Sequence, residues 1–199
     1  MESSGSNLDV FHGTSQSQAI EIEKSGFTFP RKSWPGDLGY GIYTFSDLNS
    51  EDYKDAYTAA LTYAKKYRDG NPGILKVSLN FDESDILDLD NEVVWRNLVA
   101  NVNTIQELVD QKISELEKMN GSKGAFKRGN LDGIMIEEFL SFKKLKPKLI
   151  IKERWEDIYD DIIRRGGQIP NSTVVVVREK SPITHIVDVF LRKERNYGS

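Results

Sequence analysis

The residues best suited to chemistry lie near the start of the chain, in the stretch "FHGT" from Phe11 to Thr14. The chain has two histidines, and His12 is one of them. An imidazole can donate or accept a hydrogen bond near neutral pH, and a following glycine lets the backbone approach a ligand closely. His12 and Gly13 therefore suit a ligand with amide or sugar hydroxyl groups, although a turn histidine is the simpler explanation for this motif alone.

A second segment of interest, "GDLGYGIYTF", runs from Gly36 to Phe45. Its glycines, Gly36, Gly39 and Gly41, allow tight bends before a strand that carries Tyr43. A tyrosine ring delivered in this way can stack on a planar heterocycle. The alternative is an aromatic core strand that follows a hairpin.

The elements around these motifs follow from local patterns. "LDVFHGTS" alternates apolar and polar residues and predicts a strand, and residues 15–25 predict a short helix that ends at Gly26. After an ordered loop, "YGIYTFS" predicts a second strand. Asp47 or Ser50 is the expected N-cap of a helix that continues to Tyr67.

The rest of the chain mixes strands with inserted helices. Residues 91–118 have helical spacing, with a break expected at Asn101 and Asn103. "WEDIYDDIIRR" predicts an amphipathic helix. The expected strands are "ILKVSLNF", "LDGIMIEEF", "STVVVVRE" and "THIVDVFLRK", with an extended edge or loop at "SDILDLD". This order indicates an α+β fold rather than a doubly wound sheet.

Length and composition indicate one domain. We expect residues 1–7 to be a disordered lead and residues 8–199 to form a single domain with a helical insertion at about 91–128. No apolar run approaches a membrane span of about 20 residues, and the start of the chain lacks the pattern of a secretory signal. The absence of cysteine excludes disulfides and thiolate zinc sites, and fits a soluble cytoplasmic protein.

The charge is unevenly distributed. The formal net charge is −4, which argues against a surface built throughout for nucleic acid. Residues 121–154, however, carry nine basic and four acidic side chains. This segment is either a patch that faces a polyanion or an ordinary solvated surface.

Taken together, "FHGT", "LGYGIYTF" and the later "AALTYA" resemble the ADP-ribosyltransferase fold of the PARP and diphtheria-toxin type. In that family HG(T/S), G-x-GIYF and a downstream tyrosine occur in this order. The resemblance covers residues 9–80 well and 131–190 more loosely. It implies a split, mostly antiparallel β-sheet core with inserted helices, NAD as the substrate and no metal.

The resemblance also implies roles for individual residues. His12 would hydrogen-bond the ribose on the nicotinamide side of NAD, and Thr14 would support this contact. The Gly13 backbone would bind the carboxamide of nicotinamide. Tyr43 would stack on the nicotinamide ring, and Gly41 lies in the same binding segment.

A second tyrosine would close the other face of the nicotinamide; we favour Tyr63 over Tyr53 and Tyr57. Arg31 and Lys32, in the loop before Gly36, would pair with the pyrophosphate.

One position departs from the family pattern. Polymer-forming relatives have a glutamate at the start of the late strand, where it stabilises the oxocarbenium-like transition state. Here the matching position falls on Ser172, Thr173 or Val174. The possible replacements are Glu137, Glu138 and Gln168; because neighbouring strand residues face opposite ways, only one of the two glutamates would reach a cleft. We take Glu138 as the candidate catalytic carboxylate.

The resulting expectation is an NAD-dependent mono-ADP-ribosyltransferase. Its setting would be a bacterial or phage toxin, effector or anti-phage defence enzyme that modifies a protein or nucleic-acid acceptor. A toxin also implies an antitoxin or inhibitory partner protein, for which the helices at 91–118 are the expected docking surface. The alternative is an inactive module that binds NAD, ADP-ribose or a partner on the same fold. His185 has no partner at metal-ligand spacing and is expected to be structural.

Overall fold

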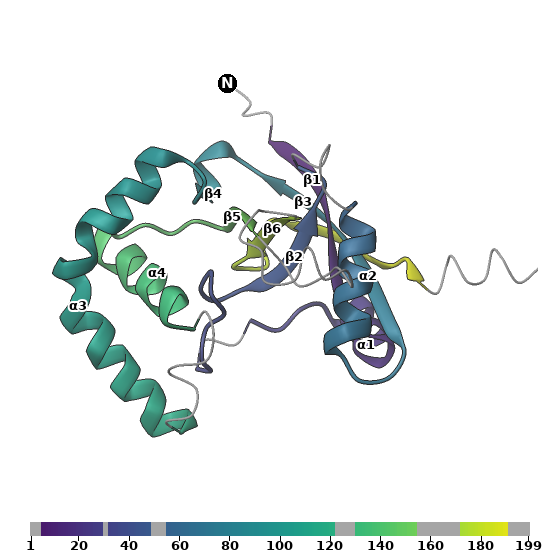
Figure 1. Cartoon of the computed structure of the whole chain (residues 1–199). Helices are drawn as coiled ribbons and strands as arrows, with labels where there is room; N and C mark the ends of the chain where they lie inside the picture. The colour runs from purple at the N-terminus through teal and green to yellow at the C-terminus, as the bar shows by residue number, and fades with distance from the viewer. Residues whose placement is uncertain (1–4, 30–31, 49–54, 122–129, 155–171, 191–199) are drawn as a thin grey trace, which may run out of the picture.

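The computed structural model describes residues 5–29, 32–48, 55–121, 130–154 and 172–190. Within these ranges the chain forms an α+β fold with one sheet of seven strands and four α-helices (Figure 1). The strands are β1 (Ser6–Ser15), β2 (Ile42–Ser46), β3 (Pro72–Phe81), β4 (Ile86–Asp88), β5 (Leu149–Arg154), β6 (Ser172–Val177) and β7 (Ile183–Asp188). The helices are α1 (Gln16–Ser25), α2 (Ala56–Tyr67), α3 (Glu92–Asn120) and α4 (Asn130–Lys143).

The strand order is β4-β5-β6-β2-β1-β3-β7, and the sheet is mostly antiparallel. Strands β4 and β5 are the parallel pair. β4 forms one edge of the sheet, after a short 3-10 turn (Glu83–Asp85), at the position expected to be an extended edge or loop. The strand β5 was not predicted, although its apolar start at Leu149, Ile150 and Ile151 is a strand signal.

Helices cover both faces of the sheet. One face packs against α2, α3 and α4 in a core that includes Phe45, Ile150 and Val174. The other face packs against α1 in a second core that includes Val10 and Val175. Figure 1 shows α3 and α4 side by side at the β4 and β5 end, whereas α1 and α2 lie near β1 and β3.

The first half of the chain has the predicted elements with adjusted ends. β1 begins at Ser6, so two residues that were expected in a disordered lead belong to the strand; residues 1–4 lie outside the described residues. The N-cap of α2 is Asp55, not Asp47 or Ser50. Asp47 nevertheless contributes to this helix end, because its Oδ1 accepts a hydrogen bond from the Ala56 N–H at 2.6 Å. Ser50 lies outside the described residues.

The break expected at Asn101 and Asn103 was wrong, because α3 is continuous from Glu92 to Asn120. The Asn101 side chain is bonded within the helix: its Nδ2 donates to the Asn97 carbonyl at 2.7 Å. Core contacts at Leu98 and Ile105 bury the helix on both sides of the asparagines. Tertiary packing therefore outweighs the local preference of asparagine for turns.

The strand expected at "LDGIMIEEF" was also wrong, since these residues belong to the helix α4. Ile134, Met135 and Ile136 form a short continuous apolar run, for which periodicity alone cannot distinguish a buried strand from a buried helix. In the helix, Ile134 and Ile136 are both buried, because α4 packs into the core and also against α3. Within the described residues, no helix is long and apolar enough to cross a membrane.

Candidate functional site

The strands β1 and β2 part at the "FHGT" motif. β1 pairs with β3 through all ten residues from Ser6 to Ser15. In the described structure it pairs with β2 only at Val10 and Phe11, opposite Ser46 and Phe45. From His12 onward, the edge of β1 that faces β2 is therefore not paired with β2 in this ladder.

His12 bridges the point where the two strands part. Its Nδ1 lies 2.8 Å from the Tyr43 carbonyl oxygen, and its ring meets Phe27 edge-on with centroids 5.3 Å apart. Burial lowers the pKa of His12 to about 4, and Arg68 also lowers it. The ring is therefore neutral at pH 7. Because a carbonyl only accepts, the proton lies on Nδ1, which leaves Nε2 as an acceptor.

Gly13 and Thr14 are tightly enclosed. A Cβ on Gly13 would lie 2.1 Å from the Ala60 carbonyl oxygen, so the glycine lets the α2 backbone pack against β1. Thr14 is buried, and its hydroxyl donates to the Gln18 Oε1 at 2.6 Å. Both residues have a packing or bonding role without any ligand.

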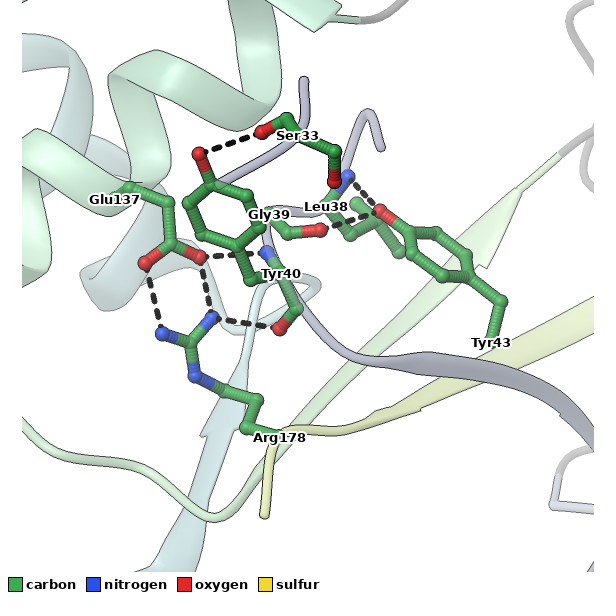
Figure 2. A network of polar contacts seen from close by, with 7 residues as sticks. All are labelled: Ser33, Leu38, Gly39, Tyr40, Tyr43, Glu137 and Arg178. Atoms are coloured by element: carbon green, nitrogen blue, oxygen red, sulfur yellow. Dashed lines mark hydrogen bonds and ion pairs between the residues drawn. The ribbon is translucent and has the colours of Figure 1, made fainter. Parts of the chain in front are cut away.

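Tyr43 anchors the glycine-rich loop, residues 36–41, which precedes β2 (Figure 2). Its hydroxyl donates to the Gly39 carbonyl at 3.0 Å and accepts from the Leu38 N–H at 2.8 Å. Burial and the nearby Asp37 carboxylate raise the pKa of this phenol. The ring lies against Gly36, where a Cβ would come within 2.3 Å of the phenol oxygen.

The side chains of His12 and Tyr43 lie on opposite faces of the sheet. Side chains alternate along a strand, so His12 shares the α1 face with Val10. Tyr43 instead packs with the core under α2 and α4, as does Phe45. The structure therefore joins the two residues through the Tyr43 backbone and does not bring their rings together.

A largely buried ion pair ties this loop to α4 and to the residue that follows β6. Glu137 Oε1 and Oε2 accept from Arg178 Nη1 at 2.6 Å and Nη2 at 2.9 Å. Oε1 also accepts from the Tyr40 N–H at 2.7 Å, and Arg178 Nη1 reaches the Tyr40 carbonyl at 3.3 Å (Figure 2). Burial and Glu137 raise the pKa of Tyr40 to about 12. The sequence offered one signal for this pair, a single arginine directly after a buried run of valines.

Glu138 has no partner in this ion pair among the described contacts. It lies on α4, and its electrostatic neighbours include Lys112 and Glu115 of α3 as well as Glu137. Burial raises its pKa. Within the described contacts, neither His12 nor Tyr43 is among its partners. Both glutamates raise the pKa of Tyr40. The strand alternation expected for them does not apply, because both lie on the helix α4.

The remaining predicted residues are distributed over several elements. Tyr63 lies on α2 and contacts Phe45, with ring centroids 6.0 Å apart, and the Arg68 guanidinium lies 5.5 Å from the Tyr63 ring centroid.

The other predicted binding residues have contacts of their own. Lys32 is exposed, and its carbonyl accepts from Asn120 Nδ2 at 2.9 Å. Tyr57 meets Phe11 edge-on. Gly41 lies close to Val176 and Val177. Arg31, Tyr53 and Gln168 lie outside the described residues.

The start of the late strand β6 carries hydroxyl groups that are bonded to the backbone. Thr173 Oγ1 donates to the Leu48 carbonyl at 2.6 Å, and Ser172 Oγ donates to the Arg154 carbonyl at 3.4 Å. Both residues are buried. These side chains stabilise the end of the sheet and supply no carboxylate.

The basic stretch at 121–154 is partly neutralised. Lys148 pairs with Asp85 at 3.0 Å, and Lys152 pairs with Asp90 at 3.4 Å. Arg154 pairs with Asp37. Lys123, Lys127 and Arg128 lie outside the described residues. The bases of β5 and its approach therefore bind aspartates of other segments, which weakens the case for a polyanion patch there.

In comparisons with models of protein families, with curated proteins and with solved structures, nothing matches this chain.

Proposed function

We propose that this protein is an NAD-dependent mono-ADP-ribosyltransferase whose seven-stranded sheet is a form of the split sheet of that fold. The observation that carries the proposal is the parting of β1 and β2 at His12 and Gly13. An unpaired strand edge at a glycine is suited to hydrogen-bond the carboxamide of nicotinamide. The His12 Nε2 acceptor is suited to a ribose hydroxyl.

In the proposed reaction the glycosidic bond between the ribose C1′ and the nicotinamide nitrogen breaks. Nicotinamide leaves with the bonding electron pair, and a nucleophile of the acceptor forms the new bond to C1′ and loses its proton. Positive charge develops on the ribose in the transition state, where nearby negative groups are stabilising. A neutral His12 can orient the ribose but supplies no charge.

The roles of the two aromatic residues need separate tests. Tyr63, on the helix that covers Gly13, is the proposed ring partner from α2. A stacking role for Tyr43 requires the loop at 36–39 to release its ring, because Gly36 now lies against it. The toxin, effector or defence setting, the cytoplasmic location and an antitoxin that docks on α3 belong to the same proposal.

A second candidate function is a module that binds NAD, ADP-ribose or a partner without catalysis. The arrangement of carboxylates favours it: Glu137 is held by Arg178, and the electrostatic neighbours of Glu138 include Lys112 and Glu115 of α3. The start of β6 has hydroxyl groups in place of the family's glutamate.

One experiment separates the two functions. The protein is incubated with NAD labelled in its adenylate and with cell lysate that is afterwards divided into protein and nucleic-acid fractions, while free nicotinamide is measured. Transfer of label, or release of nicotinamide above the enzyme-free rate, supports the enzyme. Saturable NAD binding with neither signal supports the binding module. No binding of NAD contradicts the enzyme and leaves only a module for ADP-ribose or a partner.

The same assay tests the site. His12→Ala should lower turnover by about tenfold or more, since each 1.36 kcal/mol lost from the transition state is worth a factor of ten. The exposed second histidine provides the matched control, His185→Ala, which should be unaffected. If the Tyr43 ring stacks on nicotinamide, Tyr43→Phe keeps activity and Tyr43→Ala loses it. If the hydroxyl is needed to hold the loop through Leu38 and Gly39, both variants lose activity. Full activity in His12→Ala and Tyr43→Ala would overturn the site.

A further inference from the structure

A cavity of about 220 Å³ lies next to the glycine-rich loop, on the side of α3 and α4. Its lining is mostly apolar, and its charged side chains come from three different segments. The volume is below the range of roughly 300 to 1,000 Å³ that is usual for pockets of drug-sized ligands. The cavity therefore suits one side chain rather than a whole nucleotide. Its lining comprises Asp37, Leu38, Leu89, Trp95, Leu98, Asp132, Met135, Ile136, Lys152 and Arg154.

The cavity lining has two carboxylates and two basic groups, and both basic groups are paired with aspartates. Arg154 pairs with Asp37, and Lys152 pairs with Asp90 just outside the cavity. Asp132, in the first turn of α4, has no hydrogen bond or ion pair in the part of the chain that the structure describes. Partial burial and the neighbouring Asp37 raise the pKa of Asp132, whereas Arg154 lowers it. The causes that raise the pKa prevail, so a further positive charge beside this carboxylate would be stabilising.

An aromatic ring lies beside these carboxylates. Trp95 is 45% exposed, and the Lys152 ammonium lies 5.0 Å from its ring centroid. This distance between the ammonium and the ring lies within the range of a cation–π interaction. A planar guanidinium can stack on an indole and also bond a carboxylate through two N–H groups, which an ammonium cannot do.

We infer that this cavity binds the guanidinium of an arginine side chain from a partner polypeptide. Asp132 is the proposed charge partner, and the exposed part of Trp95 is the stacking surface. The pairing of Arg154 with Asp37 is an internal example of the same recognition. Val99, one helical turn after Trp95 and 52% exposed, offers apolar surface to the residues that flank the arginine. The inference does not depend on NAD chemistry.

The test uses the whole protein without NAD and three short acetylated peptide amides that differ in one residue: arginine, citrulline or lysine. Citrulline keeps the planar shape but lacks the charge, whereas lysine keeps the charge but lacks the plane. Binding is followed by the NMR signal of the Trp95 indole N–H, which Trp95→Phe identifies among the three tryptophans. Free arginine amide and guanosine monophosphate form two further arms.

We expect the arginine peptide to shift the Trp95 signal saturably and to bind roughly tenfold or more tightly than the citrulline peptide, as the loss of a charge-assisted bond predicts. Asp132→Asn should weaken binding by a similar factor. The matched control is Asp110→Asn on α3, which lines a different cavity and should leave binding unchanged. Tighter binding of the peptide than of arginine amide supports a polypeptide source.

Several results would overturn the inference. These are no saturable shift, equal affinity for the citrulline or lysine peptide, arginine amide binding as tightly as the peptide, and unchanged affinity in Asp132→Asn. Binding of guanosine monophosphate alone would assign the cavity to a nucleobase instead. Because both aspartates are exposed, their substitution should preserve the fold, which circular dichroism checks.

Discussion

The two motifs of the proposed site, the parting of β1 and β2 at His12 and the loop anchored by Tyr43, are held in different ways. Around His12 the chain relies on close packing: Gly13 lies against the α2 backbone, and the neutral imidazole has one bond to the backbone. Around Tyr43 polar groups bond one another, through the phenol and the Glu137–Arg178 pair. A ligand can therefore approach the first region at a strand edge, but it must displace bonds to enter the second.

We expect the largest loss of stability from a substitution around Tyr43, where the polar groups bond one another. Arg178→Met leaves the Glu137 carboxylate, whose side chain is 16% exposed, without its ion-pair partner. Breaking a buried pair in this way costs about 3–5 kcal/mol of the free energy of unfolding, measured by urea denaturation. The double variant with Glu137→Leu should recover much of this loss. A double variant as unstable as Arg178→Met would show that packing, not charge, holds the loop.

The second effect concerns packing in the first region. Gly13→Ala places a methyl group 2.1 Å from the Ala60 carbonyl oxygen, which belongs to the backbone and cannot rotate away. Overpacking of this kind costs about 1–3 kcal/mol, again measured by urea denaturation. Gly5→Ala is the matched control, since its new methyl group meets only the Asn80 side chain, which can move. Equal losses in the two variants would contradict the proposed close approach of α2.

The smallest expected effect is a loss of stability at low pH, which follows from the lowered pKa of His12. The pKa of His12 is about 4 in the folded chain and about 6.5 when unfolded. The unfolded state therefore binds more protons between these values, so stability is complete above pH 6.5 and is lost as the pH falls toward 4. After allowance for its partial exposure, we expect a loss of about 1–2 kcal/mol.

The measurement for this third prediction is the free energy of unfolding of the wild type and of His12→Gln at pH 7 and pH 4.5. The stability difference between the two proteins should shrink or reverse on acidification, because glutamine does not titrate. His185→Gln serves as the control for the exposed histidine. A difference that is the same at both pH values would mean that His12 is not buried as a neutral ring.

Much of the first half of the fold could be predicted from the sequence. The strands β1, β2 and β3 have clear alternation, and the helix α1 ends at Gly26 as expected. Such elements are short and carry their own boundary signals, a glycine at a helix end or alternating apolar residues. The position of His12 beside the Tyr43 strand also agrees with the order of the motifs.

The tertiary structure decided what local patterns leave open. "GIMI" is a short apolar run that fits a buried strand as well as a helix, and packing between the sheet and α3 makes it a helix. The same packing keeps α3 continuous through Asn101. Likewise, the opposite directions of His12 and Tyr43 and the pairing of Arg154 with Asp37 depend on register and on contacts across the chain. Residue types and their order thus determined which groups are available, and long-range packing determined which of them meet, because a side chain's neighbours are set by the whole fold.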